Sequence, residues 1–269
     1  MSGPPPVLPG SASRRRTPWS WQAAAIAVSA LVLWELVIRL GWFTSIFIPA
    51  PSAIGRSLAG SLASGALMPH LTATLGRVAG GLVLGGGVGL ALGLALGWWR
   101  GLRTAIDPLV AAAHPIPKLT LFPLFIVLLG IGESAKIMVV AAAAFFPMVI
   151  NSMAGVRQIS PIYFDVARNY GASPGQIFRR VLLPGSLPLV LTGVRHAANV
   201  AFLSAVGVEM VMAQTGLGSL VWLSWQVLRV EQLFATLFVI AFLGVGLNAA
   251  LNWIAWWAAP WLADQQTQA

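Results

Sequence analysis

The sequence predicts an all-α integral membrane protein with about six transmembrane helices. Of its 269 residues, 58% are hydrophobic and only 9% are charged, whereas soluble domains carry about 25% charged residues. The mean hydropathy of +0.82 agrees with this class. Apolar segments of about 20 residues, the length that crosses a bilayer core of about 30 Å, recur along the chain. They leave no room for a separate soluble domain of about 100 residues.

The expected spans are separated by short polar loops and have tryptophans near several of their ends, as is typical of membrane interfaces. They lie at residues 21–40, 78–99, 108–130, 137–156, 187–213 and 233–257. Two further segments, near 53–63 and 218–228, are too short to span and predict interfacial helices on one side of the membrane.

The two ends of the chain are expected to be tails. Residues 1–20 are rich in Pro, Gly and Ser and cannot bury enough apolar surface to become ordered. Residues 14–16 are arginines before an apolar run, as in a signal peptide, but no small-residue cleavage pattern follows, so we expect an uncleaved first span. The membrane domain then occupies 21–260, and 261–269 forms the second tail.

The distribution of basic residues predicts the orientation, because cytoplasmic loops are enriched in Lys and Arg. If the N-terminus is cytoplasmic, that side holds Arg14, Arg15, Arg16, Arg100, Arg103, Arg157, Arg168, Arg179 and Arg180. The opposite side holds Arg56, Lys136 and Arg229. Both tails and the polar loop 157–185 are therefore expected in the cytoplasm. This scatter also argues against a nucleic-acid binder, whose basic residues gather on one face or tail.

Several kinds of chemistry have no sequence signature in this chain. It has no cysteine, and its 3 histidines are isolated, so we expect no metal site. The HExxH and GxSxG patterns are missing. No GxxxxGK[ST] sequence occurs either, so the chain is expected to bind no cofactor and to hydrolyse no nucleotide.

The second expected span carries a glycine at every fourth position, at Gly81, Gly85, Gly89, Gly93 and Gly97. On a helix this spacing forms a smooth stripe that allows close approach of another helix. A phosphate-binding glycine loop would need a preceding strand, which this segment lacks. We therefore interpret the stripe as a helix-packing surface.

Polar residues inside the third and fifth spans are candidates for a translocation path or a gate. His114 and Lys118 accompany prolines in AHPIPKLTLFP, which indicates either a broken helix beside a path or a kinked structural helix. Asn199 and Glu209 share a face with Arg195, but Arg195 and Glu209 lie about 21 Å apart along the helix and cannot pair. For Asn199 and Glu209 we expect structural or gating roles before direct substrate contact.

The cytoplasmic loop reads as two short helices around a turn. Ser160 and Ser173, each followed by proline, have the residue types of helix starts. Gly171 stands where a helix end favours positive φ. Pro184 is expected to terminate the second helix.

This loop resembles the EAA motif of ABC-importer permeases, which reads EAA, three residues, Gly, nine residues, and Ile-x-Leu-Pro. The sequence departs from that pattern by Asp165 for Glu, Val166 for Ala and Val181 for Ile. The expected ATPase-coupling residues are Asp165, Ala167, Gly171, Ala172, Val181, Leu183 and Pro184. The segments IPAPSAI and QTGLGSLVW extend the resemblance over residues 43–257, toward the sulfonate, taurine and nitrate branch.

The resemblance implies a type I ABC-importer permease of MetI-like architecture, a non-catalytic subunit of a prokaryotic inner membrane. Its implied partners are two ATPase subunits that hold ATP and Mg, an extracytoplasmic solute-binding protein and a second permease as a homodimer. The implied solute is a small anion such as an aliphatic sulfonate, taurine or nitrate, which Lys118 and Arg195 would suit. An organic heterocycle or vitamin precursor, or an ion-coupled secondary transporter, are the alternatives.

Overall fold

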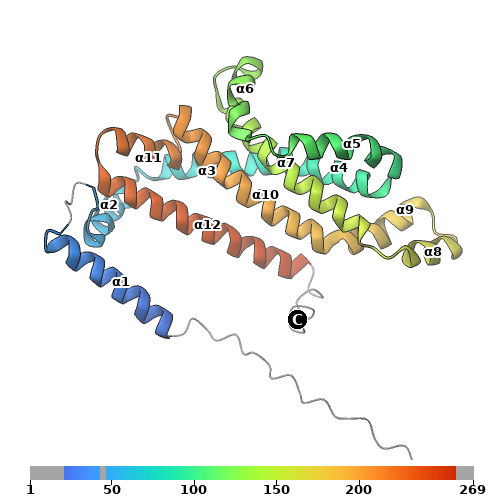
Figure 1. The fold of residues 1–269 in the computed structure, drawn as a ribbon, viewed down its shortest axis with the longest axis horizontal. Helices are drawn as coiled ribbons and strands as arrows, with labels where there is room; N and C mark the ends of the chain where they lie inside the picture. The colour runs from blue at the N-terminus through green and yellow to red at the C-terminus, as the bar shows by residue number, and fades with distance from the viewer. Residues whose placement is uncertain (1–20, 43–46, 259–269) are drawn as a thin grey trace, which may run out of the picture. The chain divides into compact units, whose positions relative to one another are not determined.

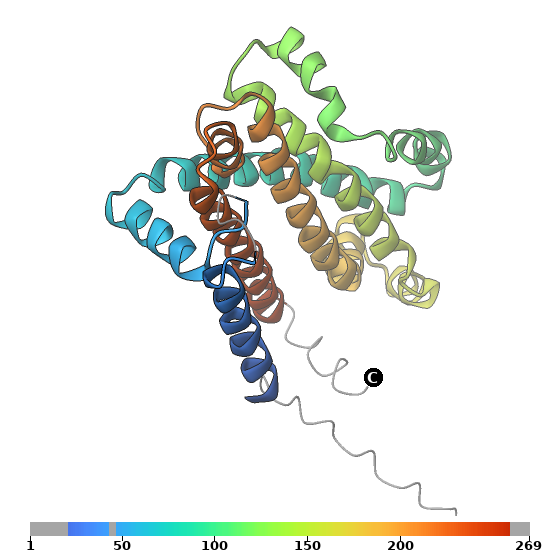
Figure 2. The ribbon, with the colours of Figure 1, turned by 60° about the vertical axis from the view of Figure 1, so that its left-hand side comes forward.

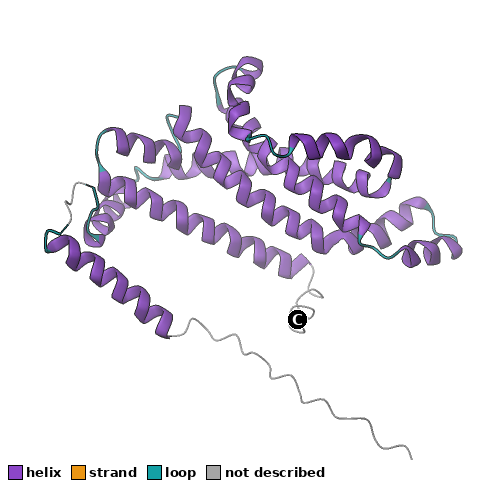
Figure 3. Ribbon diagram, viewed as in Figure 1, coloured by secondary structure: helices purple, strands orange, loops and turns teal. Residues whose placement is uncertain are grey.

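The structure is a computed structural model, and it describes residues 21–42 and 47–258. All regular structure within these ranges is helical, which confirms the predicted all-α class (Figure 3). Five of the described helices are long and apolar enough to cross a membrane, and a bent helix pair brings the number to 6 if it counts as one span. The predicted tails, 1–20 and 261–269, lie outside the described residues.

Helices and short helical turns follow one another along the described chain (Figure 1). They are α1 (Trp21–Arg39), α2 (Pro51–Ala63), α3 (Met68–Gly81), the π-helical turn η1 (Leu82–Gly86), α4 (Gly87–Trp98), α5 (Arg100–Ala113), the 3-10 turn η2 (Lys118–Leu121), α6 (Phe122–Leu129), α7 (Glu133–Arg157), α8 (Pro161–Asn169), α9 (Pro174–Ile177), the π-helical turn η3 (Phe178–Leu182), α10 (Leu183–Met212), α11 (Leu217–Gln226) and α12 (Val230–Ala258). The two predicted interfacial helices correspond to α2 and α11.

The chain forms two compact units, Met1–Ala53 and Ile54–Ala269. In the first unit the end of α1 is tied to the start of α2. The Glu35 carboxylate accepts hydrogen bonds from Arg39 Nε at 2.6 Å, from Ser52 N at 3.0 Å and from Ser52 Oγ at 2.7 Å. These contacts use the acid that would otherwise be unpaired near the end of an apolar span.

Helix α7 is the centre of the second unit, between α4 on one side and α10 on the other (Figures 1 and 2). Its small and branched apolar side chains are buried over most of its length. One cluster joins Val140, Ala144 and Met148 of α7 to Ala197 and Ala201 of α10. Alanines at these contacts let the helices approach closely, which favours association inside a membrane.

The glycine stripe faces α7 along its whole length. A Cβ atom added at Gly89 would lie 2.7 Å from the Phe145 carbonyl oxygen, and one at Gly93 would lie 2.5 Å from that of Val149. Gly85 likewise lies against the Ala141 carbonyl oxygen, whereas Gly81 and Gly97 lie against the side chains of Val140 and Val156. The stripe therefore serves a contact within one chain.

Two predicted spans are parts of longer helical stretches. The span expected at 78–99 belongs to a stretch that already begins at Met68, and the span expected at 187–213 belongs to one that begins at Pro174. The prediction that Pro184 terminates a helix is wrong. The wider turn η3 leads into α10, with Leu183 N bonded to Phe178 O, so the chain stays helical up to the proline, which occupies the first turn of α10.

The span expected at 108–130 is also corrected, because the chain breaks inside it. Helix α5 ends at Ala113 and the η2–α6 segment starts at Lys118, and the two arms meet at 94°. Pro115 and Pro117 explain the break, since each removes a backbone donor and pushes its preceding residue out of the helical region. At the base of α6, Phe122 is buried against Ala135 and Val139 of α7, and α6 projects away from the other helices (Figure 2).

A buried ion pair joins helices at the end of the second unit that contains α11 and the start of α7. The Arg77 side chain of α3 is 2% exposed and that of Glu209 in α10 is 0% exposed. Arg77 Nη1 donates to Glu209 Oε1 at 2.7 Å and to the Thr215 carbonyl oxygen at 2.7 Å. Its Nε and Nη2 donate to the Glu133 carboxylate at 2.7 and 2.8 Å.

The second carboxylate oxygen of Glu209 holds the chain that leads into α11. It accepts hydrogen bonds from Thr74 Oγ1 and from Gly218 N, each at 2.9 Å. A Cβ atom at Gly216 would collide with Glu209 and Arg77, and one at Gly218 would collide with the Val206 carbonyl oxygen. We call Arg77, Glu209 and Thr74 the buried network; Glu133, whose side chain is 57% exposed, pairs with Arg77 at its rim. Both oxygens of Glu209 are bonded, so the network fixes the turn before α11.

Replacing Glu209 by Gln is expected to lower the free energy of unfolding by about 3 kcal/mol, because it leaves Arg77 buried with less compensating charge. The measurement is an SDS titration of the detergent-solubilised protein. Glu231→Gln, which neutralises an exposed acid in the first turn of α12, is the control and should leave the transition in place. Coincident transitions for the two variants would contradict the structural role of the network.

The glycine stripe offers a matched pair of substitutions. Gly93→Ala should destabilise the protein by about 1–3 kcal/mol, because α4 must move away from α7 to admit the methyl group. Gly87→Ala, in the same helix with nothing within 4 Å of the added atom, should be neutral or slightly stabilising. The same titration compares them, and equal destabilisation would show that space at α7 is not the reason.

Candidate functional site: the α8–α9 loop and the broken span

The turn between α8 and α9 is closed by glycine, as predicted. Gly171 has φ of +75°, and its N–H donates to the Arg168 carbonyl oxygen at 2.9 Å. The N–H of Ala172 donates to the carbonyl oxygen of Ala167 at 2.9 Å. This pair of bonds is the Schellman arrangement, which needs a residue that tolerates positive φ. The predicted conformation of Gly171 is confirmed.

The start of α9 is fixed by a reciprocal cap. Gln176 N donates to Ser173 Oγ at 3.4 Å, and Ser173 N donates to Gln176 Oε1 at 2.8 Å. The predicted helix start at Ser173 is confirmed. At the start of α8, Ser160 occupies the expected position but its side chain makes no capping bond. Local hydrogen bonds thus fix the end of α8 and the start of α9.

The outer surface of the loop is rich in exposed apolar side chains. Tyr170 is 89% exposed. We call this surface the docking face, and it consists of Ile162, Tyr163, Val166 and Tyr170. Among the motif residues, Asp165, Gly171, Leu183 and Pro184 are exposed, and Ala167, Ala172 and Val181 are half-buried. Asp165 pairs with Arg168 across one turn at 3.4 Å.

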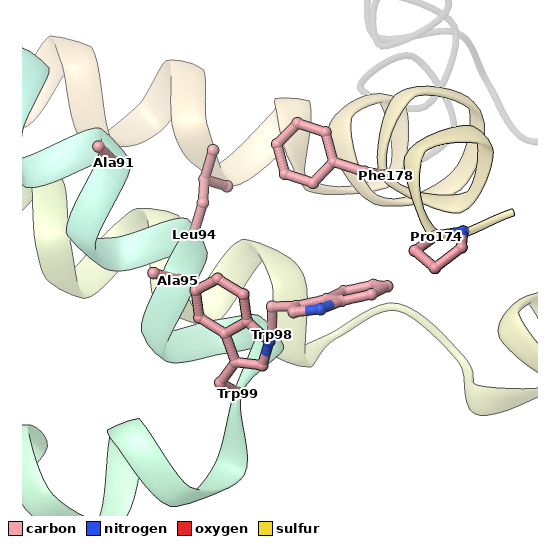
Figure 4. Close-up of a pocket in the computed structure, with 7 residues that line it drawn as sticks. All are labelled: Ala91, Leu94, Ala95, Trp98, Trp99, Pro174 and Phe178. Carbon is pink, nitrogen blue, oxygen red and sulfur yellow. The ribbon is translucent and has the colours of Figure 1, made fainter.

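The inner side of the loop rests on the ends of α4 and α7. The rings of Phe164 and Trp98 meet edge to face, with centroids 5.8 Å apart. Leu182 is fully buried with Leu94 and Val156. Beside this contact lies a cavity of about 420 Å³ with an apolar lining, formed by Ala91, Leu94, Ala95, Trp98, Trp99, Pro174 and Phe178 (Figure 4). The loop is therefore seated on α4 through aromatic rings.

Lys118 lies at the break of the third span, and its side chain bonds to the backbone on the other side of the break. Its Nζ donates to the carbonyl oxygens of Ala113, His114 and Ile116 at 3.0, 2.8 and 2.7 Å. The ammonium also stands 4.1 Å above the centre of the Phe146 ring. His114 contacts the same ring, with centroids 5.6 Å apart. Lys118 thus uses its three donors on backbone carbonyls at the break between α5 and η2.

Asn199 faces α12. Its side-chain amide exchanges two hydrogen bonds with that of Asn248, at 3.1 and 3.0 Å. The four candidate pathway residues therefore occupy three environments, namely the break for His114 and Lys118, the α10–α12 contact for Asn199, and the buried network for Glu209.

The sequence interpretation missed Arg77, because the expected span began one residue later. A signal was present, since Arg77 is four residues before Gly81 and so heads the glycine stripe. A cation on a face that packs against another helix must be buried, and a buried cation requires an acid. Glu133 and Thr74 were missed for the same reason, as both lay outside the expected spans.

Three comparisons with known proteins agree with this architecture. Residues 85–264 match the family described as binding-protein-dependent transport system inner membrane component. The taurine transport system permease protein TauC of Escherichia coli is 30% identical over 94% of this chain and 96% of its own. The putative aliphatic sulfonates transport permease protein SsuC of Bacillus subtilis is 30% identical over 85% of this chain and 83% of its own.

A solved structure of the MetNI methionine ABC transporter in an inward-facing conformation is also similar. It matches with a TM-score of 0.59 and 20% identity, over 71% of this chain and 96% of the other. This likeness shows a shared fold, which is the MetI-type fold of an importer permease. The family match and the similarity to TauC show that the chain belongs to the binding-protein-dependent transport system inner membrane components, the permease subunits of ABC importers.

Proposed function

We propose that this chain carries a small anion, an aliphatic sulfonate or taurine, into the cell as the permease of an importer powered by an ATPase that docks on the α8–α9 loop. The names of the relatives, taurine and aliphatic sulfonate permeases, support the solute class. Nitrate remains within the same anion class. The ATPase, in two copies, would hold ATP and Mg, and a second copy of this chain would complete the path.

The docking face is the observation that carries this proposal. Its aliphatic and aromatic side chains are exposed. They lie on a loop that projects beyond the long helices of the second unit (Figure 1). Exposed apolar patches of this kind mark sites of protein–protein contact. The arginines on and beside the loop, Arg168, Arg179 and Arg180, support a cytoplasmic position, with both termini on that side.

The helical connection supplies a route for mechanical coupling. Helices α9 and α10 and the turn between them form one stretch of 39 residues, Pro174–Met212. At about 1.5 Å per residue this stretch is about 58 Å long, so it reaches from the loop to the buried network. A displacement of the loop would therefore move Glu209 and, through its bonds, the turn before α11. ATP-driven closure of the docked subunits would tilt α10 in this way.

Solute would reach the permease from an extracytoplasmic binding protein. Helix α11 lies at the opposite end of α10 from the loop, and the buried network fixes its first turn. An opening of that end, driven from the loop, would admit solute that the binding protein delivers. The break between α5 and η2, where the two arms meet at 94°, provides a second place where helices could move relative to each other.

Gly171→Val should uncouple transport, because a β-branched residue at φ of +75° disrupts the turn that shapes the docking face. We expect at least tenfold slower ATP-dependent uptake of taurine or ethanesulfonate in proteoliposomes, with weaker co-purification of the ATPase. Gly175→Val, in α9 with nothing within 4 Å of its added Cβ atom, is the matched control. Wild-type uptake and co-purification in Gly171→Val would refute docking at this loop.

Uptake by the wild type should also stop when ATP is removed while the ion gradients are kept. Persistent uptake under that condition would favour an ion-coupled transporter instead.

A further inference from the structure

Helix α10 exposes a polar stripe in the middle of the second unit. Thr192, His196 and Asn199 are all exposed, and their spacing of four and three places them on one face. Neighbouring helical segments instead expose large apolar side chains. Val83 in η1 is 72% exposed, and Phe242 and Val245 in α12 are 70% and 69% exposed. The stripe therefore differs from the surfaces that suit contact with lipid.

Polar side chains inside a membrane span face the protein interior or a water-filled path, because hydrocarbon cannot solvate them. The stripe is about 10 Å long, at 1.5 Å per residue over seven positions. Leu203, on the same face one turn further, is the first large apolar residue beyond it. A polar surface of this length fits a water-filled path for a small solute, and it does not fit contact with acyl chains.

A cation, Arg195, stands beside the stripe and forms no ion pair with the described residues. Arg195 is half-buried, and its buried Nε has no hydrogen-bond partner among the residues that the structure describes. Three other basic side chains in the spans are engaged: Arg77 binds two acids, Lys136 binds Glu133, and Lys118 binds three carbonyl oxygens. The ion pairs formed by the described residues do not include Arg195.

The amide next to this cation is held in a fixed orientation. Asn199 exchanges two hydrogen bonds with Asn248, and Asn248 also donates to the Gly244 carbonyl oxygen at 2.9 Å. One amide hydrogen of Asn199 is left for another acceptor. Asn199 lies one turn from Arg195 on the same side of α10, so a group bound between them would meet a charge and an oriented donor.

We propose that Arg195, His196 and Asn199 form the site that contacts the oxyanion group of the solute as it moves along α10. A sulfonate has three acceptor oxygens, and a guanidinium binds such groups through paired N–H donors. Thr192, one turn toward the loop, extends the polar surface. One cation without a surrounding cage would bind weakly, which a path requires for release. The assignment rests on the proposed function and adds its solute contact.

The absence of cysteine makes this site directly testable. Thr192→Cys, His196→Cys and Asn199→Cys each introduce a single thiol, and Val245→Cys introduces one on the apolar face of α12. The full assembly with its ATPase is reconstituted in phosphatidylcholine nanodiscs. It is then treated with a negatively charged sulfonatoethyl or a positively charged trimethylammonioethyl methanethiosulfonate, and labelling rates are measured by mass spectrometry.

We expect the stripe thiols to be labelled and Val245→Cys to remain unlabelled. The anionic reagent should react about tenfold faster than the cationic one, relative to their rates with a free thiol, because Arg195 lies within one turn. Adding Arg195→Gln should abolish this preference, whereas Arg229→Gln, which removes an exposed arginine outside α10, should not. Ethanesulfonate at millimolar concentration should slow the labelling.

Three results would overturn the inference. They are stripe thiols that do not react, labelling without a preference for the anionic reagent, and protection by added phosphatidylglycerol but not by ethanesulfonate. The last result would assign the cation to a lipid headgroup.

Uptake in matching proteoliposomes separates the two proposals. If wild-type uptake depends on ATP while the charge preference is missing, only the anion site fails. If the anionic reagent is preferred while uptake does not depend on ATP, the proposed function is wrong and the anion site is retained.

Discussion

The bond between Arg77 and Glu209 determines how the helices of the second unit meet. Both side chains are almost completely shielded from solvent, and an isolated buried charge of either sign would be strongly unfavourable. Helices α3 and α10 must therefore meet at one register. Glu133 brings the start of α7 to the same point, and Gly218 N brings α11. The turn at Gly216 contacts both charged groups, so only a residue without a side chain fits there.

This constraint continues down the unit because Arg77 and the glycine stripe share one face. Once Arg77 is fixed, Gly81, Gly85, Gly89, Gly93 and Gly97 follow at four-residue intervals against α7. The π-helical turn at Leu82–Gly86 adjusts the helix where the contact with Ala141 is tightest. Helix α7 then presents its opposite surface to α10. Polar pairing at one end and close backbone packing along the helices thus fix α3, α4 and α10 against α7.

Local signals predicted the loop well and the long helices less well. The φ of Gly171 and the cap at Ser173 depend on nearby residues, so their sequence patterns were sufficient. The prediction for Pro184 was wrong because this residue lies in the first turn of α10, directly after the wider turn η3. In a first turn, proline costs no helical hydrogen bond. The break at His114–Pro117 was suggested by its prolines, but its bend of 94° depends on packing against α7. Arg77 was missed because its acids lie 56 and 132 positions away.

The electrostatics of α10 follow from the way its charged groups are partnered. Glu209 is compensated by Arg77, so it offers little negative potential to a passing solute, whereas Arg195 has no acid beside it among the described residues. The two groups are separated by about 21 Å of helix, too far for one to neutralise the other. A solute moving along this helix would therefore meet a positive potential near Arg195 and no opposing negative one. Anions would gain from that asymmetry and cations would not, even though a separate binding protein would make the first selection.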